Sequence, residues 1–416
     1  MKFIDIQDYK GLSKEMYILF IVRIINAMGN FIYPIMTLFL TKKLGYSTSY
    51  AGFILLISSI AYVPGSILGG ILSDKWSRKN TVFLFSVLSG VFFILAGVFN
   101  NYFYLTPIII ILANAMNGVV QPANTAMVGD LTNSENRKTA FSLLYLGHNI
   151  GFAIGPAIGG LLFENHISLL FIGNGLISLL SANLIRVFLK DNKNYINNDN
   201  ILQNDTLEEA YTESSVKLIW NNKKLLYFAL ISTLISFMFA QNNFTLPKQV
   251  DDVIENGAKY YGLLMSLNAI VVILITSVIT SITKELKASI SIAFTGLFCA
   301  LGYGILYFAN NFGIFIISTI IWTIGEILYS TNSNMYIMEN TPESHRGRFY
   351  SILPLLTGAG YAISPLIMGR YIDAFSIQSA WIIVSLVGLV IFVGMLILYR
   401  KESNQELNNE VDKQWN

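Results

Sequence analysis

The sequence predicts an all-α integral membrane protein with twelve transmembrane helices in two pseudo-symmetric bundles of six helices each. The first observation is composition: hydrophobic residues make up 54% of the 416 residues and charged residues 12%, about half the charged share of a soluble domain. The second is length, because twelve apolar segments are each long enough to cross a bilayer, which takes about 20 residues. The third is an internal repeat that relates the two halves of the chain.

A shift of 209 positions superimposes one half of the chain on the other. The matching pairs are Asp130 and Glu339, Thr132 and Thr341, Arg137 and Arg346, Ser142 and Ser351, Gly151 and Gly360, Pro156 and Pro365, and Gly160 and Gly369. The duplicated unit is a whole bundle and not a short solenoid repeat. Many secondary transporters are built from duplicated membrane bundles, with the substrate site between the halves. The repeat therefore predicts that the protein moves a solute across a membrane.

The predicted spans divide the chain into four parts. They begin near Met16, Tyr50, Thr81, Tyr102, Lys138, Ile167, Leu225, Tyr260, Lys287, Phe312, Arg348 and Gln378. Residues 1–189 form the N-terminal bundle and residues 225–400 the C-terminal bundle. Residues 190–224, rich in Asn, Asp and Glu, are predicted to be a flexible cytoplasmic linker, and the polar tail 401–416 is predicted to be disordered.

The basic residues of the loops predict the orientation, because cytoplasmic loops carry an excess of Lys and Arg. With the N-terminus in the cytoplasm, 21 of the 27 basic residues lie in cytoplasmic segments, 5 lie outside and Arg23 lies within a span. We therefore expect a multi-pass protein of the plasma membrane with both termini in the cytoplasm.

Several other classes of protein are disfavoured. A net charge of +2 argues against a nucleic acid partner, and the single Cys299 excludes a disulfide framework. The sequence has no P-loop for ATP hydrolysis, and its three histidines are far apart. We expect no metal site, no cofactor and no enzymatic activity.

A charged motif connects spans 2 and 3, reading Gly70-Ile-Leu-Ser-Asp74-Lys-Trp-Ser-Arg78-Lys79. An Asp and an Arg four residues apart in a tight turn can pair with each other and with neighbouring helix ends. Gly70 would let another helix approach closely. The alternative is an ordinary basic loop on the cytoplasmic side.

Span 5 carries a glycine motif, with Gly147, Gly151, Gly155, Gly159 and Gly160 around Pro156. Glycines four residues apart leave one helix face bare, so a second helix can pack closely against it. Proline removes a backbone hydrogen bond and kinks the helix. The motif predicts a closely packed helix that acts as a seal and hinge.

Together these motifs resemble the major facilitator superfamily. The first is similar to its loop 2–3 signature, with Ser77 in place of the second Gly, and the second is similar to the span-5 signature of its antiporter branches. The resemblance implies a monomer that works by alternating access. It also implies that Asp74 and Arg78 join Asp130 in a cytoplasmic gate, with Glu339 as the repeat partner of Asp130. The second half departs from the pattern, because loop 8–9 lacks the Asp/Arg signature.

The resemblance further implies that spans 1, 4, 7 and 10 line a central cavity. Polar side chains recur on one helix face in span 1, at Arg23, Asn26, Asn30 and Tyr33, and in span 4, at Asn114, Asn117, Gln121 and Asn124. Span 10 adds Trp322 and Ser330. Amides facing lipid would go unsatisfied, so we expect these faces to line the cavity. The alternative is that these polar side chains form hydrogen bonds between packed helices. For Arg23 a further alternative is that its side chain extends to the lipid headgroups.

Glu326, near the middle of span 10, is the candidate proton and substrate site. An ionisable group at membrane depth is costly and is a functional candidate for that reason. Related multidrug/proton antiporters use a carboxylate in span 10, which the resemblance carries over to Glu326. The Arg that many drug antiporters have in span 4 is replaced here by Asn114. The alternative is a static carboxylate with a fixed partner.

We predict a proton-coupled multidrug efflux antiporter, resembling those of Gram-positive bacteria. Its partners would be small amphipathic or cationic substrates, protons and the lipid bilayer. A metabolite carrier and a lipid-linked glycolipid flippase use the same scaffold and stay open as alternatives. A non-transporting membrane sensor is the alternative from a different class, but the sequence offers no output domain.

Overall fold

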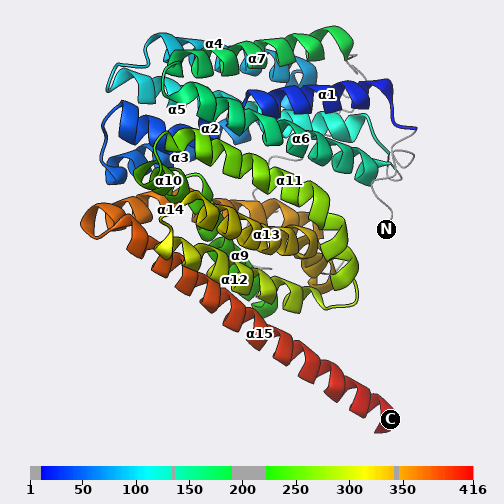
Figure 1. Cartoon of the computed structure of the whole chain (residues 1–416). Helices are drawn as coiled ribbons and strands as arrows, with labels where there is room; N and C mark the ends of the chain where they lie inside the picture. The colour runs from blue at the N-terminus through cyan, green and yellow to red at the C-terminus, as the bar shows by residue number, and fades with distance from the viewer. Residues whose placement is uncertain (1–10, 134–135, 190–221, 342–345, 416) are drawn as a thin grey trace. The chain divides into compact units, whose positions relative to one another are not determined.

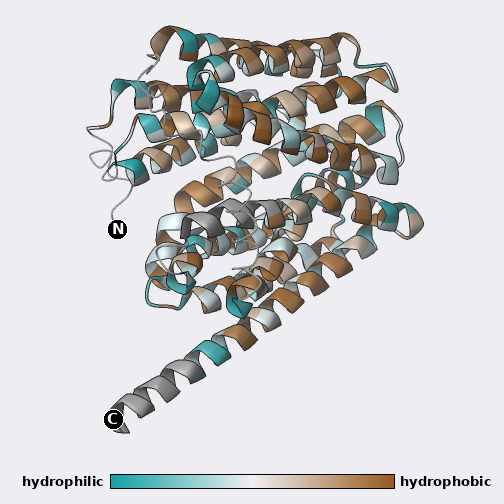
Figure 2. Ribbon diagram, turned by 180° about the vertical axis from the view of Figure 1, so that it is seen from behind, coloured by the Kyte–Doolittle hydropathy of each residue, from teal (hydrophilic) through white to brown (hydrophobic). Residues whose placement is uncertain are grey.

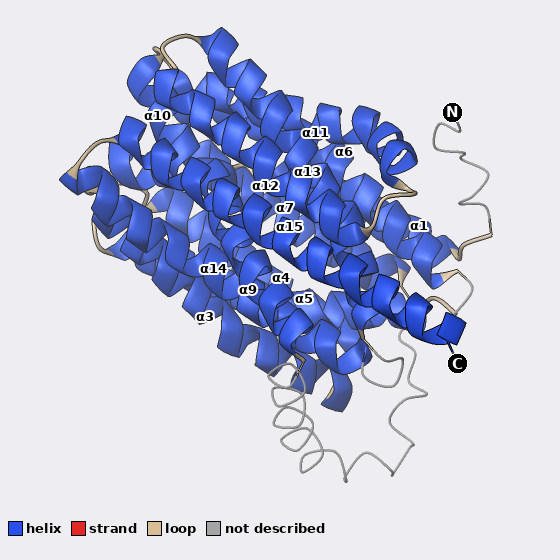
Figure 3. Cartoon of the chain, turned by 90° about the horizontal axis from the view of Figure 1, so that it is seen from below, coloured by secondary structure: helices blue, strands red, loops and turns tan. Residues whose placement is uncertain are grey.

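The computed structural model describes residues 11–133, 136–189, 222–341 and 346–415, which form helices joined by short loops (Figure 3). Eleven of its helical segments are long and apolar enough to cross a membrane. The twelfth predicted span corresponds to α14 (Arg346–Ala374). Each observed span begins at most three residues from its predicted start. The prediction of an all-α membrane protein with twelve spans is confirmed.

The chain forms two compact units. The first contains Met1–Asp199, Asn243–Ile273 and Pro365–Ala374, and the second contains Asn200–Asn242, Leu274–Ser364 and Phe375–Asn416. The first unit therefore holds the six N-terminal spans together with parts of three spans from the second half of the sequence. Each unit is described below on its own.

The first unit combines helices from both halves of the sequence (Figure 1). They are α1 (Lys14–Gly29), α2 (Ile32–Leu38), the π-helix η2 (Phe39–Lys43), α3 (Thr48–Lys75), α4 (Arg78–Val98), α5 (Leu105–Asp130), α6 (Arg137–Phe163), α7 (Ile167–Phe188), α10 (Thr245–Val253), the first part of α11 (Gly257–Thr283) and the end of α14. Three of these helices start at a serine, Ser13, Ser47 and Ser77, whose hydroxyl accepts a backbone N–H of the first turn. Such caps satisfy donors that a helix start leaves free.

The second unit contains α9 (Lys223–Phe239), the 3₁₀ turn η5 (Ala240–Asn242), the rest of α11, α12 (Ala288–Gly304), the 3₁₀ turn η6 (Ile305–Phe308), α13 (Phe312–Asn340), most of α14 and α15 (Ile377–Trp415). The tail corrects a prediction, since α15 continues to Trp415 where disorder was expected. The tail has no Pro or Gly, and extending an existing helix avoids the cost of nucleation. Most of the predicted linker, residues 190–221, lies outside the described residues.

Spans 1 and 7 are both broken, at matching positions of the repeat. Span 1 breaks between α1 and α2 at Asn30, and span 7 breaks after Phe239, 209 positions later. Irregular backbone at membrane depth is tolerated only where protein or water satisfies it. At the second break the Tyr303 hydroxyl donates to Asn242 Oδ1 over 2.9 Å, and Gln241 Nε2 donates to the Phe237 carbonyl over 3.1 Å.

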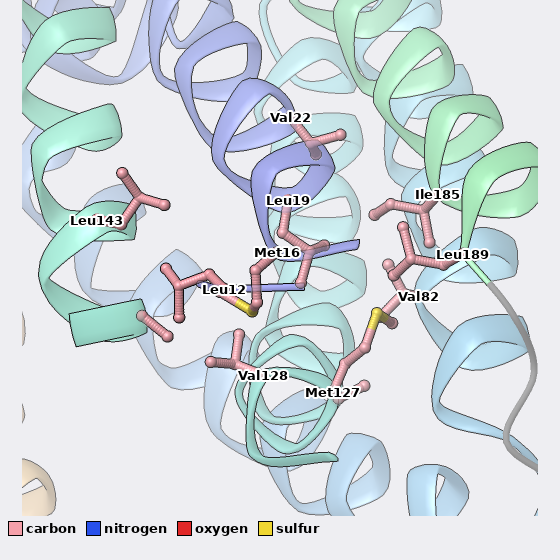
Figure 4. Close-up of a cluster of buried hydrophobic side chains, with 12 residues drawn as sticks. Leu12, Met16, Leu19, Val22, Val82, Met127, Val128, Leu143, Ile185 and Leu189 are labelled. Atoms are coloured by element: carbon pink, nitrogen blue, oxygen red, sulfur yellow. The ribbon is translucent and has the colours of Figure 1, made fainter. Parts of the chain in front are cut away.

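Apolar side chains make up both the interior and much of the outer surface of the bundles. Figure 2 shows hydrophobic residues along the outward faces of the helices, as a bilayer requires. Inside the first unit, α1, α4, α5, α6 and α7 share a cluster of buried side chains (Figure 4). There Met16 and Leu19 of α1 lie close to Met127 of α5 and Ile185 of α7.

Candidate functional site

Arg78 joins two helices at the end of the first unit where α4 begins, which we name the Arg78 end. Its guanidinium forms an ion pair with Asp130, the last residue of α5, and donates to the Ala126 carbonyl over 3.2 Å. Asp74 is more distant, with 3.9 Å between its Oδ1 and Arg78 Nη2, and its side chain is 64% exposed against 16% for Asp130. A cation at the C-terminus of α5 is also favoured by the helix dipole. The three predicted gate residues are therefore together, with Asp130 as the main partner of Arg78.

One residue of this motif, Gly70, differs from expectation, and a second, Ser77, caps a helix. Gly70 makes no close approach, since a Cβ atom there would meet nothing within 4 Å, whereas one at Gly69 would collide with Val119 and Pro122 of α5. Gly69 is therefore the glycine that brings α3 close to α5. Ser77, which replaces a Gly of the family signature, accepts the Asn80 N–H over 3.2 Å and caps α4.

The second half builds the matching position differently. Glu339 is exposed in the last turn of α13, one turn after Tyr336. The Tyr336 hydroxyl donates to Glu402 Oε1 of α15 over 3.0 Å. A tyrosine–carboxylate hydrogen bond therefore joins two helices here, where an arginine–carboxylate pair joins two helices in the first half.

The glycines of α6 serve two neighbouring helices. Three of them face α1: a Cβ atom would meet Phe20 at Gly147, Ile24 and Ala27 at Gly151, and Met28 at Gly155. At Gly159 it would meet Phe31, which lies between α1 and α2. Gly160 instead faces Ala258 of α11. We name the contact of these three glycines with α1 the α1–α6 seam. It fixes which residues of α1 and α6 lie side by side.

The proline of α6 takes part in a contact that the repeat duplicates. The Pro156 carbonyl lies against Gly262 of α11, and its repeat partner Pro365 of α14 lies against Gly52 of α3. A side chain at either glycine would collide with the proline carbonyl. These glycines end the two Tyr-x-Gly sequences that open spans 2 and 8. The structure thus gives a packing reason for that repeated signature.

An ion-pair network that the sequence analysis missed lies at the opposite end of the first unit, which we name the Lys42 end. Lys42 Nζ is 2.7 Å from Glu164 Oε1 and 2.8 Å from Asp251 Oδ1, and Lys43 Nζ is 3.3 Å from Glu164 Oε2. Lys42 and Asp251 occupy equivalent positions of the repeat, 209 residues apart. Opposite charges at matching repeat positions were the signal that could have revealed this pair.

Asp373, the repeat partner of Glu164, makes a second polar contact at the Lys42 end. Its carboxylate accepts the backbone N–H of Thr48 over 3.1 Å and the backbone N–H of Ser49 over 2.7 Å. Asp373 therefore caps α3 from α14, and the positive end of the α3 dipole favours its charge. Three helix ends from the second half of the sequence, in α10, α11 and α14, are thus fastened to the first six spans within this unit.

We expect the Lys42 network to weaken in acid. Burial raises the pKa of the Glu164 carboxyl, but hydrogen bonds and charges from Lys42 and Lys43 outweigh burial and hold the pKa below its usual range. The ion pairs therefore contribute fully above the ordinary pKa of a glutamate, about 4.3, and their contribution is lost as the pH falls through the lowered pKa. Partly exposed pairs contribute roughly 1 kcal/mol or less each. Glu164→Gln should lower the melting temperature by about 1–3 °C at pH 7.

Melting of the purified protein and of Glu164→Gln between pH 7 and pH 3.5 measures this effect. The difference in melting temperature should be constant from pH 7 to pH 5 and should shrink below about pH 4.3. A difference that grows as the pH falls would contradict the assignment. Glu255→Gln, which changes an exposed carboxylate that forms no ion pair with the described residues, is the control.

The predicted cavity residues of the first unit fall into two groups. Arg23, Asn26, Tyr33 and Gln121 are exposed, whereas Asn30, Asn114, Asn117 and Asn124 are half-buried. Asn114 donates to the Ser58 hydroxyl over 2.6 Å and so joins α5 to α3. The packing alternative therefore describes Asn114, whereas Arg23, Asn26, Tyr33 and Gln121 lie at the surface of the unit.

Glu326 lies half-buried on α13 in the second unit. It interacts electrostatically with Cys299 and Tyr303 of α12. Tyr303 stacks between Trp322 and Trp381, with ring centroids 6.0 and 5.7 Å apart. Trp322 corrects a prediction: it is only 1% exposed, because its ring is packed against Tyr303, so it lines no open surface. Ser330, one turn beyond Glu326 on α13, is exposed.

Comparisons with known proteins agree with this architecture. The model of the Major Facilitator Superfamily matches residues 19–353 and 258–416. The uncharacterized transporter YttB of Bacillus subtilis is 26% identical over 415 residues, covering 96% of this chain and 99% of its own. A Na(+), Li(+), K(+)/H(+) antiporter of Planococcus maritimus is 24% identical and covers 80% and 84%. The quinolone resistance protein NorA of Staphylococcus aureus is 22% identical and covers 96% and 100%.

Solved structures share the fold. A POT family transporter bound to 5-aminolevulinic acid superimposes with a TM-score of 0.75 over 94% of this chain and 97% of its own, at 16% identity. The nucleoside transporter NupG superimposes with a TM-score of 0.74 over 93% and 99%, at 14% identity. At these identities the likeness concerns the fold.

Proposed function

Because this chain belongs to the major facilitator superfamily, we propose that it exchanges protons for small amphipathic or cationic compounds and exports them by alternating access. Membership makes it a membrane transporter. The observation that carries the finer proposal is Glu326, a carboxylate held at membrane depth on α13 beside stacked aromatic rings. Such a group is costly in a membrane and is characteristic of a proton or ion pathway.

Exchange follows if the proton and the substrate compete for Glu326. A cationic substrate favours the charged carboxylate, whereas a proton neutralises it, so the two bind in turn. Each ligand then biases the transporter only through its differential affinity for the two conformations. One proton moving down 100 mV releases roughly 2.3 kcal/mol, which concentrates a neutral substrate about fifty-fold.

We propose that the two ends of the first unit act as gates. We assign the Arg78 end to the cytoplasm, with both termini, and the Lys42 end to the outside, which the distribution of basic residues supports. Partly exposed ion pairs such as Lys42–Asp251 contribute little stability each. Weak contacts of this kind can form and break within one transport cycle. The α1–α6 seam and Pro156 would serve as seal and hinge.

The relatives support two substrates. The quinolone resistance proteins favour export of drugs. The Planococcus maritimus antiporter favours exchange of Na⁺ or K⁺ for protons, which is our second candidate. A carboxylate in the membrane suits both, since it binds a proton or a cation. The substrate therefore has to be decided by a transport measurement.

Ethidium efflux from energised cells that express the protein tests the proposal. We expect cells with the transporter to retain several-fold less dye than cells without it, and a protonophore to abolish the difference. In everted vesicles, Na⁺ or K⁺ that dissipates a pH gradient, with no dye movement, would replace the drug proposal by the second candidate. If neither occurs, metabolites and lipid-linked glycolipids are the substrates to test on the same scaffold.

A further inference from the structure

Arg23 is a cation inside a membrane helix, and its side chain forms no ion pair or hydrogen bond with the described residues. It lies nine residues into α1, about 13 Å along the axis from the start of the helix. The ion pairs of the described residues involve other cations, and no described residue forms a hydrogen bond with the Arg23 side chain. Charged side chains at such depth normally pair within the protein or face water.

One titratable neighbour of Arg23 is itself a base. His148 of α6 interacts electrostatically with Arg23 and stacks on Phe152 with ring centroids 5.9 Å apart. The α1–α6 seam holds the two side chains in this register, because Gly147 packs on Phe20 and Gly151 packs on Ile24. Two basic groups are thus brought together by close backbone packing.

No carboxylate of the surrounding helices compensates this charge. Helices α6 and α7 contain no Asp or Glu, and the single acid of α5, Asp130, is paired with Arg78. The acid of α1, Glu15, is in the first turn, about 12 Å along the helix from Arg23. The region around Arg23 is therefore electropositive, and an anion is the partner that it lacks.

The exposed surface of α1 has an apolar part and a polar part. Tyr17 and Ile21 are exposed and apolar, as a lipid-facing surface requires, whereas Arg23 and Asn26 are exposed and polar. Asn26 follows Arg23 by three residues and so lies on the same face, where its amide can donate a further hydrogen bond. Arg23 and Asn26 therefore form a polar face on α1.

We propose that Arg23, with His148 beside it and Asn26 one turn away, binds the carboxylate of an organic acid or of a zwitterionic substrate. The inference rests on the proposed function, since it names a substrate class of the same transporter. A guanidinium binds a carboxylate through two parallel hydrogen bonds, which lysine cannot reproduce. The anion subsite would extend the substrate range from cations to amphipathic acids.

Binding of carboxyfluorescein to the full-length protein in nanodiscs of neutral phosphatidylcholine, followed by fluorescence anisotropy, tests the subsite. We expect the wild type to bind the dye, Arg23→Gln to bind it at least tenfold more weakly and Arg23→Lys to keep part of the affinity. Arg186→Gln is the matched control, because Arg186 is exposed in the last turn of α7 with its guanidinium over Phe83. It should bind carboxyfluorescein as the wild type does.

The outcomes separate this inference from the proposed function. Binding needs no proton gradient, and ethidium, a cation, should bind Arg23→Gln at least as well as the wild type. If the wild type binds ethidium but not carboxyfluorescein, or if Arg23→Gln binds carboxyfluorescein unchanged, the subsite is overturned while drug export stands. If anionic phosphatidylglycerol in the nanodisc displaces the dye, Arg23 binds a lipid phosphate and the substrate assignment is overturned.

Discussion

Replacement of Glu326 by glutamine should abolish proton-driven dye export while leaving the protein folded. Glutamine has nearly the same shape, and Glu326 is half-buried, so the packing of α13 on α12 should persist. The variant can neither bind a proton nor attract a cation, so the competition that drives exchange is lost. Export of ethidium against its gradient should fall more than tenfold, and ethidium binding should no longer depend on pH.

Everted vesicles with an imposed pH gradient measure the export, and anisotropy of ethidium on the purified protein between pH 5 and pH 8 measures the binding. Glu255→Gln is the matched control, because it removes an exposed carboxylate from the loop after α10 and should export dye normally. If Glu326→Gln exports dye and keeps its pH-dependent binding, Glu326 is a static carboxylate and the proton site lies elsewhere.

Replacement of Gly151 by leucine should unfold or severely destabilise the first unit. A Cβ atom at this position would lie 2.6 Å from Ala27 Cβ and 2.8 Å from the Met28 backbone nitrogen, and it would also collide with the Ile24 carbonyl. Two of these three atoms belong to the backbone of α1 and cannot move aside, so α1 and α6 would have to separate. Overpacking of this kind costs about 3 kcal/mol or more.

The fraction of monodisperse protein after size-exclusion chromatography, together with the melting temperature, measures this loss. Gly70→Ala is the control, since its new methyl group meets nothing within 4 Å and alanine is the better helix former. We expect Gly70→Ala to be as stable as the wild type or slightly more stable. Equal stability of Gly151→Leu would show that the α1–α6 seam is looser than its glycines imply.

The spans were predictable because each one is a local property of the sequence. A run of about 20 apolar residues must become a helix in lipid, whatever its neighbours are. For the same reason the association of Arg78 with Asp74 could be anticipated, since the two lie four residues apart in one short turn. Asp130 was anticipated only through the resemblance to a family, because it comes from another helix.

Other features depend on which helices meet, and that is decided by tertiary packing. The sequence cannot tell whether Gly69 or Gly70 faces α5, or whether Trp322 faces a cavity or Tyr303, because both depend on how a helix is rotated about its own axis. The repeat marks Lys42 and Asp251 as equivalent positions but does not say that they form an ion pair. The sequence alone therefore determined the spans, their order and their duplication, which follow from local hydrophobicity. The tertiary structure decided the partners of each polar and small residue, because helix–helix packing in a membrane is set by close contacts between distant segments of the chain.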